Sequence, residues 1–226
     1  MDFFRFPHTP HLAWLGKERP RADKVLSPDE VQEVLTHDLT VEEKVDGANV
    51  GFSVDEQGVL CVQNRGNFIA RETCHPQFKP LFRWLEPRRD ALADALFPDL
   101  MLFGEWCWVV HSVRYTKLPD WFLAFDVYDR SKGEFWSAVR RDVLTHRLGL
   151  ELVPKLGEGR FNLEQLQQLL SSSRLSDASA EGLYIRWDEP DRLVARAKLV
   201  RPEFVQSIEE HWTKRALQTN LLAGAT

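Results

Sequence analysis

The stretch Glu43-Lys44-Val45-Asp46-Gly47-Ala48-Asn49 places a lysine where a predicted strand ends in a glycine turn. Residues 39–46 alternate with a period of two, which is typical of a β-strand. A lysine at the end of such a strand extends from a rigid edge, so its amine can reach into a cleft. Lys44 is therefore a candidate nucleophile, although a solvated charge beside a turn also explains these few residues.

A nucleophilic lysine needs surroundings that lower its pKa. At the ordinary lysine pKa of ~10.4, about one molecule in 2,500 carries a free amine at pH 7. Attack near neutral pH asks for a pKa ~3 units lower, equivalent to ~4 kcal/mol of differential stabilisation. Nearby cations and partial desolvation lower a lysine pKa in this way. A nucleophilic Lys44 therefore predicts basic or metal-binding residues elsewhere in the chain.

Charged residues interrupt several other predicted strands. Charges inside apolar strands are rarely buried without a partner. Arg196 and Lys198 lie two positions apart in the strand 193–200, so they share one face of it. Each site alone fits a core salt bridge or a solvated sheet surface, whereas five such sites in one chain favour a shared polar cleft. The sites are Asn64-Arg65-Gly66, Glu105, Asp126, Glu181, and the pair Arg196 and Lys198.

The order of predicted elements indicates an α+β fold with antiparallel sheets, because hairpins dominate the middle of the chain and helices lie between them. Ser27 and Glu30 form a capping box, and Asn162 caps a later helix. We expect strands at 39–46, 49–54, 59–63, 100–106, 121–128, 182–188 and 193–200. We expect helices at about 28–37, 77–97 (interrupted by Pro80 and Pro87), 138–148, 163–170 and 203–219. Residues 55–58 and 131–133 are predicted hairpin turns, and residues 171–180 a surface loop.

The composition excludes several classes of protein. The 226 residues carry a net charge of −5, so there is no overall basic surface of the kind that coats nucleic acids. The three cysteines are far apart and are predicted to be reduced thiols, which favours the cytoplasm. No uncharged apolar run approaches the ~20 residues of a membrane span, and the first residues do not resemble a signal peptide.

Taken together and in order, these motifs resemble the covalent nucleotidyltransferase superfamily of ATP-dependent ligases and mRNA capping enzymes, and within it the RNA ligase 2 type. Lys44-x-Asp46-Gly47 is similar to the first motif of that superfamily, and Phe103-Gly104-Glu105 to the third. Phe125-Asp126, Glu181-Gly182 and Arg196-Ala197-Lys198 are similar to the motifs that follow. The resemblance implies the fold of the ligase and capping-enzyme catalytic core, with antiparallel sheets flanking an ATP cleft.

The resemblance also implies a role for each matching residue. Lys44 would accept AMP, with Asp46, Arg196 and Lys198 as the other catalytic residues. Asn49 would handle the RNA end, and Phe125 would stack on the purine. Glu181 and Glu105 would hold Mg²⁺ or Mn²⁺, whose hard character suits oxygen ligands. The implied nucleotide site comprises Glu43, Lys44, Arg65, Glu105, Phe125, Glu181 and Lys198.

Two features depart from the pattern of that superfamily. The fifth motif has arginine, Arg196, at its first basic position, where a lysine is usual, and arginine lacks the compact geometry of an ammonium group. Only a short segment follows Lys198, with room for neither an OB-fold nor the C-terminal domain of RNA ligase 2. We therefore expect one adenylyltransferase domain over residues 1–226, and substrate contacts from its core surface, its terminal helix or a partner protein.

The implied activity is ATP-dependent joining of an RNA 5′-phosphate end to a 3′-hydroxyl end through lysyl-AMP and an adenylylated end. Positioning and charge neutralisation would catalyse each displacement at phosphorus, and the cations Lys198, Arg196 and Arg65 would lower the Lys44 pKa. A DNA nick ligase, a capping-type nucleotidyltransferase and a catalytically silent nucleotide- or RNA-binding module are the alternatives. Asn49 and the overall likeness favour RNA.

Weaker signals have no assigned role. His8-Thr9-Pro10-His11 is interpreted as a structured N-terminal segment. Three basic pairs fit either contact with a nucleic-acid backbone or ordinary solvated helix faces. These pairs are Arg88-Arg89, Arg140-Arg141 and Lys214-Arg215.

Overall fold

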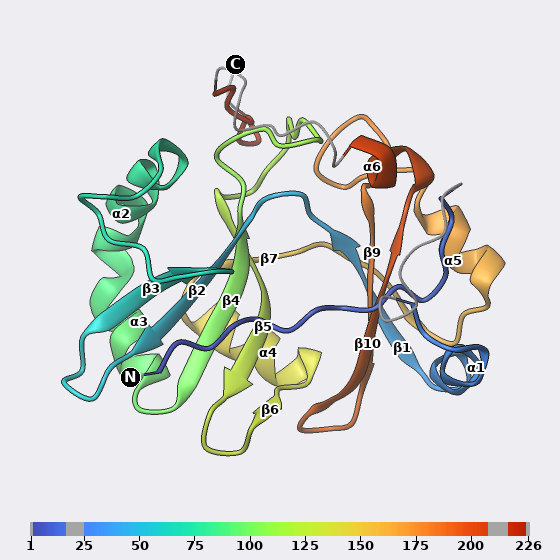
Figure 1. Cartoon of the computed structure of the whole chain (residues 1–226), viewed down its shortest axis with the longest axis horizontal. Coiled ribbons are helices and arrows are strands. Elements are labelled where there is room, and N and C mark those ends of the chain that lie inside the picture. Colours follow the sequence, from blue (N-terminus) through green and yellow to red (C-terminus); the bar gives the residue numbers. More distant parts are fainter. Residues whose placement is uncertain (1, 17–24, 208–216, 225–226) are drawn as a thin grey trace.

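Two antiparallel β-sheets form the centre of the protein, as a computed structural model of residues 2–16, 25–207 and 217–224 shows (Figure 1). Sheet A has the strand order β10-β9-β1-β8, and sheet B has the order β3-β2-β4-β5-β6, with the short β7 parallel to β5. The strands of sheet A are β1 (Leu39–Lys44), β8 (Lys155–Gly159), β9 (Gly182–Asp188) and β10 (Leu193–Val200). Those of sheet B are β2 (Ala48–Val54), β3 (Leu60–Asn64), β4 (Leu100–Trp106), β5 (Phe122–Asp129), β6 (Glu134–Phe135) and β7 (Glu151–Leu152).

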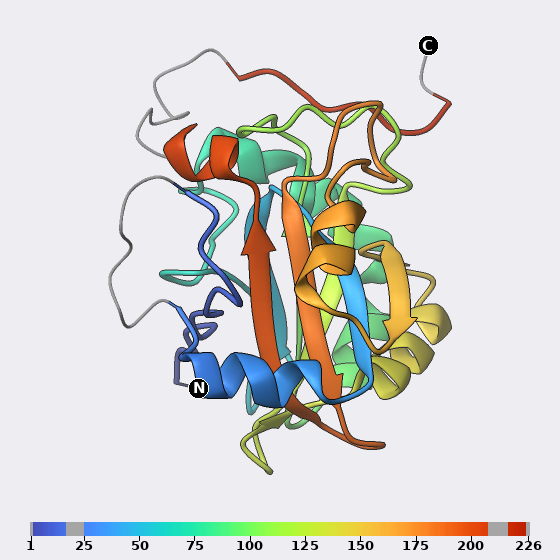
Figure 2. The same ribbon diagram turned by 90° about the vertical axis from the view of Figure 1, so that its right-hand side faces the viewer.

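Helices cover the outer face of each sheet. On sheet A, α1 (Pro28–Leu35) and α5 (Leu163–Leu169) bury apolar side chains against the odd-numbered residues of β1, such as Val41 (Figure 2). On sheet B, α2 (Lys79–Leu85), α3 (Arg89–Leu96) and α4 (Ala138–Arg147) pack against a core that includes Phe52 and Leu102. The inner faces of both sheets are thus left for the residues between them.

The helix starts confirm the capping signals in the sequence. The Ser27 hydroxyl accepts a bond from the Glu30 N–H while the Glu30 carboxylate accepts one from the Ser27 N–H. Asn162 and Gln165 form the same reciprocal pair at α5. Pro80 lies in the first turn of α2, where its missing N–H costs no helical bond, so it does not interrupt the helix.

Three expectations about secondary structure are wrong. Strands β7 and β8 lie in a region without a predicted strand. The loop 171–180 is not purely a surface loop, because Leu175, Ser176 and Ala180 are buried. The beginning of the predicted helix 203–219 is confirmed as α6 (Pro202–Ser207), residues 208–216 lie outside the described residues, and the predicted end is wrong because residues 217–224 are not helical.

Residues 217–224 instead lie along the loop that follows β4. The Val110 N–H donates to the Gln218 carbonyl, and the Asn220 N–H donates to the Trp108 carbonyl. The buried Asn220 side chain donates to the carbonyls of Cys107 and Val109 and accepts from the Tyr115 N–H. These hydrogen bonds to the loop after β4 explain why residues 217–219 are not helical.

The N-terminal segment crosses the inner side of both sheets (Figure 1). The Gln63 side chain donates to the Phe4 carbonyl at the sheet B end of the path. Farther along, the Leu12 N–H donates to the Lys198 carbonyl, and the Lys198 N–H donates to the Pro10 carbonyl. Hydrogen bonds to the edge strands β3 and β10 therefore hold residues 2–16 in place, and this segment forms one wall of the space between the sheets. Among the described residues, no helix has the length and apolar character to cross a membrane.

Candidate active site

The inner face of sheet A carries a band of polar side chains. Glu42 and Lys44 lie on the same side of β1, because residues two apart in a strand share a face. Glu42 is opposite Tyr184 on β9, and Tyr184 is opposite Lys198 on β10. Arg196 lies two residues before Lys198, so the expectation that both share a face is confirmed. Polar alternation along three neighbouring strands thus builds one charged surface facing sheet B.

A cavity between the two sheets gathers most of the predicted site. Seven of the residues expected at the nucleotide or the RNA end line it: Glu43, Lys44, Asn49, Arg65, Glu105, Phe125 and Lys198. The other lining residues are Phe6, His8, Thr9, Val45, Val153 and Tyr184. Glu181, Asp46 and Arg196 are not among the lining residues, but Glu181 accepts a hydrogen bond from Lys44, which does line the cavity.

Lys44 is paired with Glu181. The Lys44 Nζ lies 2.6 Å from Glu181 Oε1, and the two side chains are 28% and 11% exposed. Burial lowers the pKa of Lys44, but the negative charges of Glu181, Asp46 and Glu105 raise it by more, so the net shift is upward. The expectation that Arg65, Arg196 and Lys198 lower this pKa is wrong here, because the field of the carboxylates at the amine dominates.

Three buried oxygen atoms near Lys44 have no hydrogen-bond partner: Asn49 Oδ1, Glu105 Oε2 and Glu181 Oε2. Asn49 and Glu105 are directly opposite one another on β2 and β4. Unpaired buried oxygens are costly unless a cation or a donor satisfies them. A hard divalent cation fits this oxygen set, since Mg²⁺ binds one or two carboxylates and completes its shell with water and substrate phosphates. No group of three or more His, Cys, Asp or Glu in the described ranges forms a metal cage by itself.

The Glu105 carboxyl makes the stability of the protein depend on pH. Burial raises its pKa to about 8; Lys44 opposes this rise, and Glu181 and Asp46 add to it. Because its folded-state pKa exceeds the ordinary 4.5, the folded state binds more protons between pH 4.5 and 8. Its stabilising contribution is full below pH 4.5 and is lost as the pH rises to about 8.

We expect the free energy of unfolding to fall by ~1–3 kcal/mol across this interval in the wild type, and by less in Glu105→Gln. Denaturant titrations at a series of pH values measure both slopes. Glu56→Gln, at an exposed turn position, is the control and should keep the wild-type slope. An unchanged slope in Glu105→Gln would show that this carboxyl does not carry the effect.

The Asp46 side chain binds the loop that follows β4 and does not line the cavity. Its carboxylate Oδ2 accepts hydrogen bonds from the N–H groups of Ser112 and Val113, at 2.6 and 2.9 Å. Its own N–H donates to the hydroxyl of the buried Tyr115 at 2.7 Å. The Asn220 side chain supports the same loop from its other side, so the C-terminal segment 217–224 stabilises the backbone next to Lys44.

Gly47 lies in close contact with the end of β4. A Cβ at this position would lie 3.0 Å from the Trp106 carbonyl oxygen and 3.1 Å from Glu105 Cβ, tighter than nearly all real Cβ contacts. The glycine therefore lets the end of β1 approach the end of β4. This approach brings Lys44 and Glu105 to the same cavity from different sheets.

Glu43 points away from the Lys44 side chain and anchors the loop 171–180. Its carboxylate accepts hydrogen bonds from the Ser173 hydroxyl and the Arg174 N–H. Burial raises the pKa of this carboxyl, and the two hydrogen bonds oppose the rise. Glu43 is 1% exposed and is one of the residues that line the cavity. The loop that precedes Glu181 is in this way fixed to the residue that precedes Lys44.

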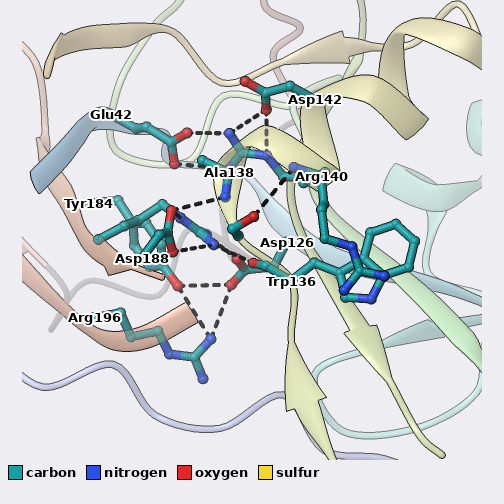
Figure 3. Close-up of polar contacts among 12 residues, drawn as sticks. Glu42, Asp126, Trp136, Ala138, Arg140, Asp142, Tyr184, Asp188 and Arg196 are labelled. Carbon is teal, nitrogen blue, oxygen red and sulfur yellow. Dashed lines mark hydrogen bonds and ion pairs between the residues drawn. The ribbon is translucent and has the colours of Figure 1, made fainter. Parts of the chain in front are cut away.

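Arg196 is committed to a buried ionic network (Figure 3). Its Nη1 lies 3.0 Å from Asp126 Oδ2 and 3.3 Å from the Tyr184 hydroxyl. Its guanidinium also stacks over the rings of Phe6 and Phe135, at 4.6 and 4.3 Å. These contacts hold Arg196 behind the cavity wall, whereas Lys198 lines the cavity itself.

One wall of the cavity is aromatic, and two of its three residues, Phe6 and Tyr184, were missed in the sequence. Phe6, Phe125 and Tyr184 form this wall, with the Phe6 and Phe125 rings edge to face at 5.3 Å. The N-terminal segment contributes Phe6, His8 and Thr9 to the lining. The signal available in the sequence was the cluster of aromatic residues and histidines before residue 12, for which no spacing rule assigns a function.

The basic pairs on the helices have different environments. Arg141 is buried, so contact with a nucleic-acid backbone and a solvated helix face are both wrong for it. Arg140 stacks over Trp136 at 4.0 Å, and Arg88 over Trp84 at 4.3 Å. The pair Lys214-Arg215 lies outside the described residues.

Comparisons with known proteins identify the family and the fold. A family model described as RNA ligase matches residues 37–200, which is more than half of the chain. A lysine-to-alanine mutant of Naegleria gruberi RNA ligase, solved with ATP and Mn, superposes with a TM-score of 0.65 at 17% identity, covering 88% of this chain and 56% of the other. The same ligase with PPi gives a TM-score of 0.59 at 18% identity, covering 93% and 62%.

A glutamate-to-alanine mutant of that ligase with AMP and Mn gives a TM-score of 0.61 at 16% identity and covers 91% of this chain and 58% of the other. The chain thus spans little more than half the length of these solved structures. At such identities the likeness shows the fold, which is of the nucleotidyltransferase type. A comparison with curated proteins finds no match.

Proposed function

The chain belongs to the RNA ligase family, and on that premise we propose that it is an ATP-dependent RNA ligase that stores AMP on Lys44. The observation that carries the proposal is the Lys44 amine, 2.6 Å from Glu181 Oε1, at a cavity that also holds Arg65, Glu105 and Lys198. An amine, two carboxylates and two cations beside an aromatic wall suit a nucleotide, because each part of ATP meets a group of matching chemistry.

The aromatic and the cationic residues of the cavity would bind different parts of the nucleotide. The aromatic wall of Phe6, Phe125 and Tyr184 would take the adenine base, since ring stacking and apolar contact favour a flat heterocycle. Arg65 and Lys198 would neutralise the phosphate oxygens, as charge-assisted hydrogen bonds to phosphate require. Lys44 lies on the same face of sheet A as Tyr184 and Lys198.

The proposed reaction has three displacements at phosphorus. The Lys44 nitrogen bonds to the α-phosphorus of ATP while the bond to the bridging oxygen breaks, which releases pyrophosphate and gives a proton to solvent. A 5′-phosphate oxygen then attacks the lysyl-AMP, breaking its P–N bond and freeing Lys44. Finally a 3′-hydroxyl attacks the activated 5′-phosphate, forms the phosphodiester and expels AMP. In each step Arg65 and Lys198 would stabilise charge on non-bridging oxygens.

Glu181 and Glu105 would hold Mg²⁺ or Mn²⁺, with the Asn49 amide oxygen beside them. Such a cation would supply positive charge against the phosphates and cancel the carboxylate field that raises the Lys44 pKa. We also place Asn49 at the RNA end, since its Oδ1 is buried without a partner at the cavity.

We also propose the extent of the catalytic domain, a partner protein and a cellular location. Residues 1–226 would act as one adenylyltransferase domain. A partner protein would supply part of the grip on RNA, because the net charge of −5 provides no broad basic surface. The described structure contains Cys61, Cys74 and Cys107 as free thiols, which suits a location in the cytoplasm.

Transfer of label from nucleotide to protein tests the central claim. The chain is incubated with Mg²⁺ and either ATP or GTP labelled at the α-phosphorus, then denatured and separated from free nucleotide. We expect label on the protein from ATP and much less from GTP. Label from GTP alone would indicate a capping-type enzyme, and no label from either nucleotide would overturn the proposal.

Nicked duplexes identify the acceptor. The substrates carry a 5′-phosphate at the nick and either ribose or deoxyribose at the 3′-hydroxyl side. We expect sealing of the ribose substrate, and sealing of only the all-DNA nick would contradict the assignment to RNA.

A further inference from the structure

Phe125 occupies an irregular position in β5. On the neighbouring β4, Phe103 pairs with Asp126 and Gly104 pairs with Ala124, so Phe125 is passed over in the register. One extra residue in a strand pair is a β-bulge, which turns the side chain in a new direction and releases its backbone from the ladder. The bulge directs the Phe125 ring toward the cavity and leaves its carbonyl oxygen to be satisfied by other groups.

Arg141 of α4 supplies the main donor to that carbonyl. Its Nη1 lies 2.6 Å from the Phe125 oxygen, and Arg186 adds a longer contact at 3.3 Å. The same Nη1 donates to Glu42 Oε2, while Nη2 donates to Glu42 Oε1 and to Asp142 Oδ1. With Nε also donating to Asp142 Oδ1, one guanidinium makes five hydrogen bonds to four acceptor atoms.

These contacts join the two sheets behind the cavity. Glu42 belongs to β1 of sheet A and lies two residues before Lys44 on the same face, whereas Phe125 belongs to β5 of sheet B. The side chains of Arg141 and Glu42 are each 1% exposed. Figure 3 shows Glu42 on one side of this network and Asp126, Tyr184 and Arg196 on the other. Arg141 is thus a rigid link between the strand of the nucleophile and the strand of the aromatic wall.

We propose that Arg141 is a positioning residue that sets the distance between Lys44 and the Phe125 ring, and so aligns the α-phosphorus of ATP with the amine. The inference rests on the proposed function. A buried ion pair is a weak source of stability, because desolvation offsets the attraction, so simple stabilisation does not account for this one. A planar fork with fixed donor directions does define geometry, and a lysine cannot reproduce it.

Arg141→Lys tests the link while keeping the positive charge beside Glu42. Its three donors cannot reach both carboxylates and the Phe125 carbonyl in the same directions. We expect the rate of lysyl-AMP formation at saturating ATP to fall roughly 10- to 100-fold, because a displacement of about 1 Å has effects of this size. The Kd for ATP should rise about 10-fold, whereas the Kd for inorganic pyrophosphate, which does not use the aromatic wall, should change less than about 2-fold.

The matched control is the neighbouring residue. Arg140→Lys alters a guanidinium that stacks on Trp136 and donates to the Asp191 carbonyl, without contact to β5. This variant should keep the wild-type Kd values and rate. A double-mutant cycle with Phe125→Leu adds a second test, since residues acting through one contact have non-additive effects. Additive losses, or an equal rise in the Kd for pyrophosphate, would overturn the positioning role.

A second variant tests the inference if Arg141→Lys fails to fold. Glu42→Leu combined with Arg141→Met removes both charges, and apolar replacements of buried ion pairs often keep a protein folded. We expect this variant to have the same selective loss of ATP binding, and wild-type ATP binding would contradict the inference. If wild-type protein forms no lysyl-AMP, the proposed function fails; if wild type and Arg141→Lys label equally, only this inference fails.

Discussion

Lys44→Ala is expected to abolish the transfer of AMP to the protein, to below one part in ~10⁴ of the wild-type rate. Among the residues that line the cavity, Arg65 carries a guanidinium, which is a poor nucleophile, and Lys198 extends from a different strand, so neither replaces the Lys44 amine. The measurement is retention of α-phosphate label on denatured protein. Label that is labile in acid and stable in alkali identifies the phosphoramidate of a lysine.

Non-covalent binding separates loss of chemistry from loss of the site. The aromatic wall, Arg65 and Lys198 do not depend on the Lys44 side chain, so Lys44→Ala should still bind ATP within about 10-fold of the wild-type Kd, as calorimetry would show. Lys155→Ala, at an exposed position paired with Glu158, is the matched control and should label normally. Persistent labelling of Lys44→Ala would remove Lys44 as the acceptor.

Glu181→Gln is expected to reduce the rate of lysyl-AMP formation about 10²- to 10³-fold, the usual effect of losing one preorganised charged group in an active site. The amide keeps the shape of the side chain and an oxygen that can accept from Lys44, which lies 2.6 Å from Glu181 Oε1 in the wild type. It loses the negative charge that would bind a divalent cation. The concentration of Mg²⁺ needed for half-maximal labelling should rise at the same time.

The sign of this effect tests the role of the carboxylate. The negative charge of Glu181 is the largest influence that raises the Lys44 pKa, so its removal lowers that pKa and enlarges the fraction of free amine. If Glu181 only restrained the lysine, Glu181→Gln would label faster than wild type near pH 7. A faster variant with unchanged Mg²⁺ dependence would therefore contradict the metal role. Glu203→Gln, at an exposed carboxylate, is the control for charge alone.

Local sequence patterns predicted much of the chain correctly because they act over a few residues. The capping box of Ser27 and Glu30 and the hairpin of residues 49–54 and 59–63 are confirmed, since caps and turns depend on neighbours in the chain. The candidate nucleophile and the polar residues within strands were also visible, because a charge in an apolar strand needs a reason. The short strands β7 and β8 were missed, since they exist only as partners of β5 and β1.

The electrostatic environment of Lys44 could not be predicted from the sequence. The motif indicated that basic residues belong to the site, but it contains no distances. Folding places Glu181 2.6 Å from the amine and pairs Arg196 with Asp126. The charges of Glu181, Asp46 and Glu105 therefore raise the pKa of Lys44. Coulomb energies depend on separation and burial, which are properties of the packed chain.

By itself the sequence determined which lysine is the candidate nucleophile, the order of the motifs around it and the α+β class of the fold with its antiparallel sheets. These follow from residue type, spacing and periodicity, which are local. The tertiary structure alone decided that Asp46 ties down a loop, that Arg141 joins β1 to β5, and that Phe6 of the N-terminal segment completes the aromatic wall. Each of these depends on contacts between residues far apart in the chain, whose geometry exists only once both sheets have packed together.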